Sequence, residues 1–151
     1  MRTNVLGETE AANSETGFTL LELLVVIAIL GIIAAIATPG LKRARQYAHS
    51  GSATQSLRTV TTAEYARQNR AKTYATLATL YAEGLIQSDL ADGEKGAYTF
   101  TLTLGPGATT FVLTATPEEE PTVLDHFYVD ESGVIRFNTG APADANSPPI
   151  Q

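Results

Sequence analysis

Side chains of the types used in catalysis are sparse in this sequence. Asp125 and His126 are adjacent, and two serines lie near His49, so residue type alone would allow hydrolase chemistry. A serine hydrolase of the α/β kind needs a Gly-x-Ser-x-Gly turn, which the sequence lacks. The 151 residues also contain no cysteine, which excludes a thiolate nucleophile, a disulfide and a cysteine-ligated zinc site. We therefore predict that the protein is not an enzyme and has no cofactor.

Three carboxylates, Asp89, Asp92 and Glu94, lie close together in a glycine-bearing stretch. Calcium prefers oxygen ligands of this kind, but the spacing does not match an EF-hand loop. A solvated acidic loop explains the same residues. We predict no metal site, and these three side chains are the candidates if calcium binds.

Glu22 lies inside a run of 20 residues, Phe18 to Ala37, that is otherwise nearly all apolar. As a helix this run would span about 30 Å, the thickness of the hydrocarbon core of a bilayer. A plain membrane anchor explains the length, but an unpaired acid at mid-bilayer costs about 2.5–3.5 kcal/mol. A secretory signal peptide, cleaved after Ala35-Ile36-Ala37, is a second alternative. The acidic segment before the run and the length of the run count against that alternative.

The stretch "GFTLLE", the apolar run with Gly31, and "ATPG" with Pro39 together resemble the N-terminal signature of type IV pilins and of type II secretion pseudopilins. The resemblance covers Gly17 to Pro39. It combines a short polar leader, a Gly-Phe junction, a glutamate four residues after the phenylalanine and a proline near the end of the run. It implies a structural subunit of a type IV pilus-like filament. A secretion pseudopilin is the nearest alternative, and a membrane-tethered or secreted binding module that never polymerises is a further one.

The resemblance also implies roles for individual residues. A prepilin peptidase would cut after Gly17, and the new amino terminus at Phe18 would be methylated. The amine of Phe18 is mostly cationic at neutral pH, and such filaments pair it with the glutamate of an adjacent subunit, here Glu22. A paired charge in low dielectric costs much less than an unpaired one, so Glu22 would set the axial register.

The resemblance implies partners and a location as well. The partners would be the prepilin peptidase, an inner-membrane assembly platform, and copies of this chain or other pilins. The precursor would cross the inner membrane once, and assembly would yield a cell-surface or periplasmic filament.

The sequence divides into four predicted parts: a leader (1–17), an apolar transmembrane and assembly helix (18–39), a stem helix (40–72), and a globular head (73–151) with a flexible tail from about 140. Gly31 weakens the helix and Pro39 removes a hydrogen-bond donor, so we expect a kink or local opening there.

Alternating apolar residues predict strands in the head. One hairpin covers 98–104 and 110–116, and a second covers 126–137 with Glu131-Ser132-Gly133 as its turn. A short helix is predicted within 74–86, followed by a loop over 88–96. The predicted fold is therefore α+β: a long N-terminal helix packed on a four-stranded antiparallel sheet, with one short extra helix.

Charge is unevenly distributed. Residues 40–72 carry seven Lys and Arg residues and only one acid, Glu64, whereas residues 73–151 carry two basic residues and eleven acids. Two solvated faces would explain this, and so would attraction between the stem of one copy and the head of the next. The net charge of -6 argues against a dedicated nucleic-acid binder.

Overall fold

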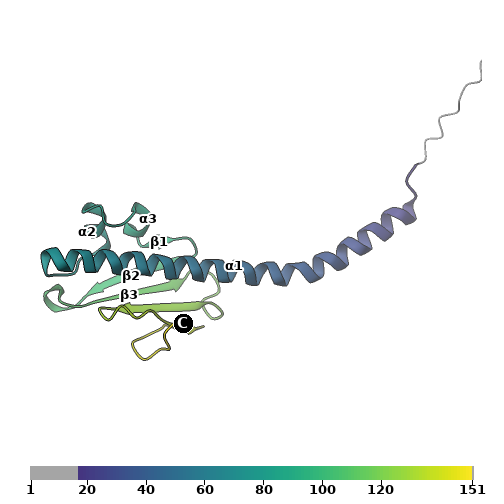
Figure 1. The fold of residues 1–151 in the computed structure, drawn as a ribbon. Coiled ribbons are helices and arrows are strands. Elements are labelled where there is room, and N and C mark those ends of the chain that lie inside the picture. Colours follow the sequence, from purple (N-terminus) through teal and green to yellow (C-terminus); the bar gives the residue numbers. More distant parts are fainter. Residues whose placement is uncertain (1–16, 151) are drawn as a thin grey trace, which may run out of the picture. The chain divides into compact units, whose positions relative to one another are not determined.

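One long helix and an antiparallel sheet account for most of the structure (Figure 1). The computed structural model describes residues 17–150. The chain divides into two units, Met1–Gly40 and Leu41–Gln151. The helices are α1 (Leu20–Ala71), α2 (Leu77–Ala82), α3 (Ser88–Ala91) and the 3-10 turn η1 (Pro106–Ala108), and the strands are β1 (Glu94–Lys95), β2 (Tyr98–Leu104), β3 (Phe111–Pro117), β4 (Asp125–Asp130) and β5 (Arg136–Thr139).

The sheet is a simple antiparallel meander in the order β1-β2-β3-β4-β5. β2 and β3 form its longest pair, from Tyr98 opposite Pro117 to Leu104 opposite Phe111. The turn before β5 contains Gly133 at φ +73°, a conformation that glycine adopts without strain. The predicted α+β fold, a long helix packed on an antiparallel sheet, is confirmed.

The core lies between the second half of α1 and one face of the sheet. Leu57 and Val60 of α1 are fully buried, as are Leu113 of β3 and Val129 of β4. Figure 1 shows α1 running along the sheet, with α2 and α3 beside the helix. The period-two pattern of β2 and β3 directs alternate apolar side chains to this core. Fully burying side chains of this size stabilises the fold by about 1.5–3 kcal/mol each.

The predictions of four strands and of a loop over 88–96 are wrong. This stretch contains α3 and the two-residue strand β1, which pairs with Tyr98 and Thr99 and gives the sheet a fifth strand. The backbone N–H of Phe100 donates to the carbonyl oxygen of Gly93 at 2.6 Å. A Cβ on Gly93 would lie 2.8 Å from the carbonyl oxygen of Phe100, so glycine allows this close approach. A strand of two residues is too short for periodicity to reveal.

The described part of the tail packs against β5, where the sequence predicts a flexible segment from about 140. Phe137 N–H donates to the carbonyl oxygen of Pro148 (3.0 Å), and Ile150 N–H donates to that of Ile135 (2.9 Å). Ala143 and Ser147 are buried. The tail therefore covers the outer edge of β5, an edge that would otherwise be open to pairing with another chain.

A fragment spanning 40–151 is expected to fold on its own. Its core consists entirely of residues from Ala53 onward, so removing the apolar segment costs it no buried contact. The measurement is chemical unfolding followed by circular dichroism. One cooperative transition is expected, and a fragment without such a transition would contradict the division of the chain.

Candidate assembly site at the start of α1

The start of α1 is closed by a capping box formed by Thr19 and Glu22. The Thr19 hydroxyl accepts from the backbone N–H of Glu22 at 3.1 Å. In return, Oε2 of Glu22 accepts from the backbone N–H of Thr19 (3.3 Å) and from its hydroxyl (3.2 Å). These bonds satisfy donors that the first helical turn leaves without partners. Glu22 thus has a local structural role that follows from the pattern Thr-x-x-Glu.

Only one oxygen of the Glu22 carboxylate takes part in this box. Within residues 17–150, Oε1 of Glu22 accepts no hydrogen bond. The side chain lies among exposed neighbours, with Phe18 83% and Leu20 88% exposed. The carboxylate can therefore cap its own helix and still accept a hydrogen bond from another group.

The apolar segment has no partner within the described chain. Every side chain from 17 to 45 is exposed, including the large apolar residues between Phe18 and Leu41. α1 is long and apolar enough to cross a membrane by length and composition, with a mean hydropathy of 3.0 over its most apolar window. So much exposed apolar surface on one segment indicates a lipid or protein environment.

The helix continues through Gly31 and Pro39 in this structure. Just before the proline, the hydroxyl of Thr38 donates to the carbonyl oxygen of Ala34 at 2.7 Å. Nothing packs within 4 Å of a Cβ built on Gly31. Local opening of the helix at these residues on assembly stays a prediction.

The comparisons with known proteins point to the same segment. Residues 12–38 match the family described as the prokaryotic N-terminal methylation motif, which is typical of type IV pilins and pseudopilins. The N-terminal segment of the chain therefore carries a prepilin-type motif. No curated protein and no solved structure matches it. Such a motif implies processing by a prepilin peptidase and pilus assembly, and the apolar helix is consistent with a membrane precursor.

The structure places the other candidate residues in local contacts of the head. Asp89 pairs with Lys95 at 3.1 Å, and the described residues include no group of three His, Asp or Glu side chains that could hold a metal ion. His126 is buried, and its Nε2 lies 2.8 Å from the carbonyl oxygen of Pro121. The hydroxyl of Thr139 donates to the carboxylate of Asp125. Proteins of this kind are normally structural rather than enzymatic.

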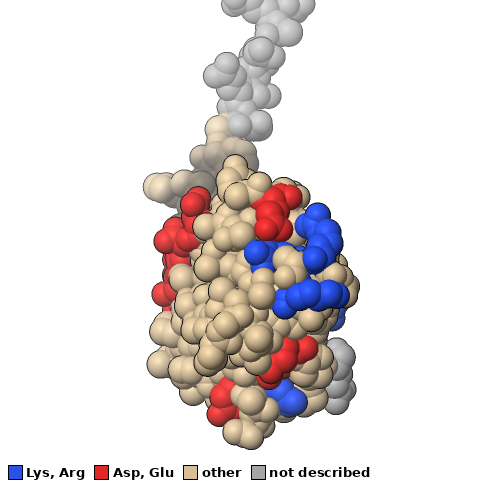
Figure 2. All heavy atoms as spheres, turned by 90° about the vertical axis from the view of Figure 1, so that its left-hand side faces the viewer, with Lys and Arg blue, Asp and Glu red and all other residues tan. Residues whose placement is uncertain are grey.

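The basic stem and the acidic head are joined by ion pairs within one chain. Lys42 pairs with Glu120, whose second oxygen accepts from the side-chain amide of Gln46 at 3.1 Å. At the C-terminal end of α1, Glu83 binds both Arg67 (3.0 Å) and Arg70 (3.6 Å). Figure 2 looks onto this end and shows basic and acidic groups side by side on a mostly uncharged surface. Three of the seven basic stem residues are therefore paired with two acids of the head within one chain.

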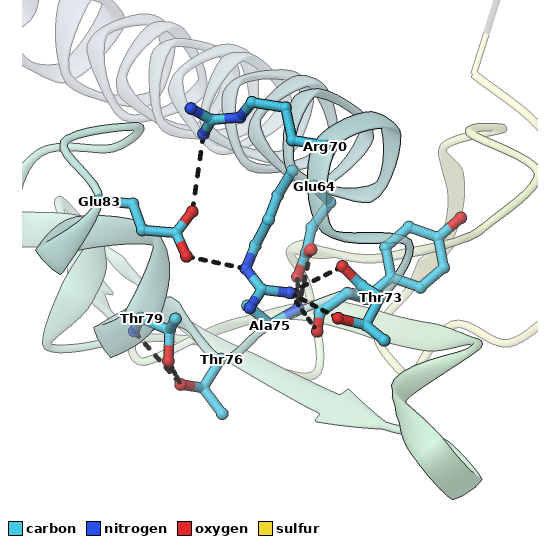
Figure 3. A network of polar contacts seen from close by, with 9 residues as sticks. Glu64, Arg70, Thr73, Ala75, Thr76, Thr79 and Glu83 are labelled. Carbon is cyan, nitrogen blue, oxygen red and sulfur yellow. Dashed lines mark hydrogen bonds and ion pairs between the residues drawn. The ribbon is translucent and has the colours of Figure 1, made fainter.

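A buried polar cluster fixes the turn between α1 and α2 (Figure 3). Glu64 is fully buried, and its two carboxylate oxygens accept from the backbone N–H of Ala75 at 3.2 and 3.0 Å. Nη1 of Arg67 donates to the carbonyl oxygens of Thr73 (2.7 Å) and Tyr74 (2.9 Å). In the sequence, Glu64 stands out only as the single acid among the basic residues of the stem. Its burial and its contact with Ala75 depend on the folded turn, which no local pattern indicates.

Burial makes Glu64 a source of pH dependence. Desolvation raises the pKa of its carboxyl to about 7, against the lowering effects of the Ala75 N–H and the Arg67 charge. Between pH 4.5 and 7 the folded state therefore retains a proton that the unfolded state releases. Stability falls as pH rises through this window, because the folded state binds more protons there.

We expect unfolding of the 40–151 fragment to require up to about 3 kcal/mol more free energy at pH 5 than at pH 8 from this group alone. Hydrogen bonds from Lys42 and Lys95 hold the pKa values of Glu120 and Asp89 below their usual range, so these acids stay charged across the window. The measurement compares urea unfolding of the unchanged fragment and Glu64→Gln at both pH values. An identical pH dependence in the two proteins would contradict the assignment.

Proposed function

We propose that this chain is a structural subunit of a type IV pilus-like filament. It is cut between Gly17 and Phe18, methylated on the Phe18 amine, and assembled through its N-terminal helix. The precursor crosses the inner membrane once, and the processed subunit leaves that membrane when the assembly platform adds it to the filament. Copies of the chain or other pilins then replace lipid around the apolar segment.

The observation that carries this proposal is the geometry of Glu22. The capping box uses Oε2 alone, which leaves Oε1 for the Phe18 ammonium of an adjacent subunit. A plain anchor needs the apolar run but not a carboxylate within its first turn, where charge is costly in lipid. Helix capping and pairing between subunits together account for a glutamate at this position.

A type II secretion pseudopilin is the alternative that shares every feature discussed so far. It would use the same cleavage, the same Glu22 pair and a shorter filament. The genes beside this one would separate the two: a retraction ATPase favours a pilus, and secretion outer-membrane components favour a pseudopilin.

Processing tests the proposal against a non-polymerising membrane module or a secreted one. Protein extracted from its native membrane is expected to begin at Phe18 and to carry a methyl group on its amine. Intact mass and fragmentation of the N-terminal peptide measure both properties. A chain that begins at Thr38 would show signal-peptide cleavage, and an uncut chain would favour a plain anchor.

A further inference from the structure

Part of the positive charge on α1 has no partner in its own chain. Arg43, Arg45 and Arg58 are exposed and form no ion pair with any described residue. α1 offers no exposed carboxylate between 41 and 71, because its one acid there, Glu64, is buried. The surface of α1 therefore carries positive charge that its own chain does not neutralise, with Arg43 and Arg45 on opposite sides of the helix because they are two residues apart.

The acidic loop between β3 and β4 presents the complementary charge. Glu118 and Glu119 are exposed, and Glu119 has no hydrogen-bond or ion-pair partner among residues 17–150. The next residue, Glu120, binds Lys42 and Gln46, which holds the loop at the level of residues 42–46 of its own α1. Glu118 accepts a hydrogen bond from the Thr99 hydroxyl through Oε1 at 3.0 Å, so the loop presents the Glu119 carboxylate and the second oxygen of Glu118 at a known height along the stem.

We propose that the loop glutamates Glu118 and Glu119 bind Arg43 and Arg45 of adjacent copies in the filament, so that each arginine meets a neighbouring loop on its own side of the helix. This inference rests on the proposed function, because the pair between Phe18 and the neighbour's Glu22 supplies the stagger. Phe18 and Glu22 are four residues apart; Phe18 precedes α1 by two residues, and we take the stagger as the length of four residues of helix, about 6 Å. Screw symmetry gives every atom of the neighbour the same axial displacement. The loop lies level with residues 42–46 of its own helix. On a neighbouring helix that runs along the filament axis, it therefore lies level with residues 38–42 in one direction and 46–50 in the other.

This stagger selects among the three unpaired arginines. Arg43 and Arg45 lie within one helical turn of either level, which the length of an arginine side chain can cover. Arg58 lies at least eight residues away, or about 12 Å along the helix. Arg58 is therefore a matched control. Like Arg43 and Arg45 it is an exposed arginine of α1 without an ion pair among the described residues, but it lies too far along the helix to reach the loop.

The surface beside Arg43 is hollowed. A groove of about 330 Å³ is lined by Arg43, Tyr47 and Val123, with Tyr47 77% and Val123 56% exposed. Pro121, which follows the three glutamates of the loop, is exposed and offers apolar surface to such side chains, whereas Pro117 before them is buried. Asp125 also lines the groove, so we expect the glutamates to contact the arginines at its margin rather than its interior.

Cross-linking between two single-cysteine proteins tests the contact, since the natural chain has no cysteine to interfere. Arg45→Cys and Glu119→Cys are produced together, and sheared filaments are treated with a short bismaleimide. Because each chain carries only one cysteine, a linked peptide containing both positions must join two copies. That peptide is expected at a yield about tenfold above the same experiment with Arg58→Cys. Equal yields, or filaments without the Arg45–Glu119 peptide, would overturn the proposal.

Charge reversal provides the functional test. Arg43→Glu with Arg45→Glu is expected to lower filament yield roughly tenfold, since each exposed pair contributes modestly and reversal adds repulsion. Adding Glu118→Arg and Glu119→Arg is expected to restore the yield, and Arg58→Glu to leave it unchanged. If the arginine changes released the unassembled chain from its membrane, and the added glutamate changes did not restore filament yield, the arginines would face lipid headgroups and the proposal would be wrong. Absence of filaments from the unchanged chain would instead refute the proposed function itself.

Discussion

Glu22→Gln is expected to reduce filament assembly more than a hundredfold while membrane insertion and cleavage after Gly17 continue. Glutamine retains the shape of the side chain and can still accept from Thr19, so the helix start is largely kept. It leaves the Phe18 ammonium of the neighbouring subunit without a counter-charge in low dielectric. Breaking one side of a buried pair costs about 3–5 kcal/mol, and about 1.4 kcal/mol is tenfold in an equilibrium constant. A filament repeats this contact at every subunit.

Thr19→Val is the matched control for the capping box. Valine has nearly the same shape but lacks the hydroxyl that accepts from the Glu22 N–H at 3.1 Å. Loss of an N-cap costs about 0.5–2 kcal/mol, so assembly should fall much less than with Glu22→Gln. The measurement is the yield of sheared surface filaments relative to processed protein in the membrane. Equal losses in the two variants would assign the role of Glu22 to capping alone, and normal yield with Glu22→Gln would remove its role in register.

The elements that sequence analysis located have strong local signals. Alternation in "YTFTLTL" indicates β2 because each residue's face follows from its position, and the buried stripe at Leu57 and Val60 follows from helical spacing. The start of α1 could have been found in the same way. Thr19 and Glu22 form a Thr-x-x-Glu capping box before an apolar run, a signal present in the sequence but not used.

Contacts between distant segments could not be derived in this way. β1 is two residues long and exists because Gly93 allows a close backbone approach to Phe100. The tail from Gly140 has the proline-rich composition of a flexible segment, yet the edge of β5 supplies hydrogen-bond partners for it. The pairing of Lys42 with Glu120 likewise depends on where the β3–β4 loop folds, which no local pattern records.

The largest loss of head stability among the polar residues is expected for Arg67→Met. Nη1 of Arg67 donates to the carbonyl oxygens of Thr73 and Tyr74, and Nε donates to Glu83 at 3.0 Å. Methionine can fill the space of the aliphatic stem but provides no donor. Two carbonyls lose their partner, and the buried carboxylate of Glu64 loses the nearby positive charge. Together these losses should cost about 2–4 kcal/mol of unfolding free energy.

Arg70→Met separates this network from a general loss of positive charge. Arg70 is on the same helix and binds the same Glu83, but at 3.6 Å and with its side chain 65% exposed. An exposed pair of this kind contributes about 0–1 kcal/mol, so its removal should change the unfolding free energy little. Urea unfolding of the 40–151 fragment at pH 7 measures both variants, and equal losses would contradict the role of Arg67.

The pH dependence of Arg67→Met gives the more specific test. The positive charge of Arg67 lowers the pKa of the Glu64 carboxyl, and burial raises it. Without that charge the pKa of Glu64 should rise further, so the variant should lose more stability relative to the unchanged fragment at pH 8 than at pH 5. Glu64→Gln in the same background should abolish this difference, because glutamine has no proton to release between pH 5 and 8. A loss that is the same at both pH values would show that Arg67 acts only through its hydrogen bonds to the turn.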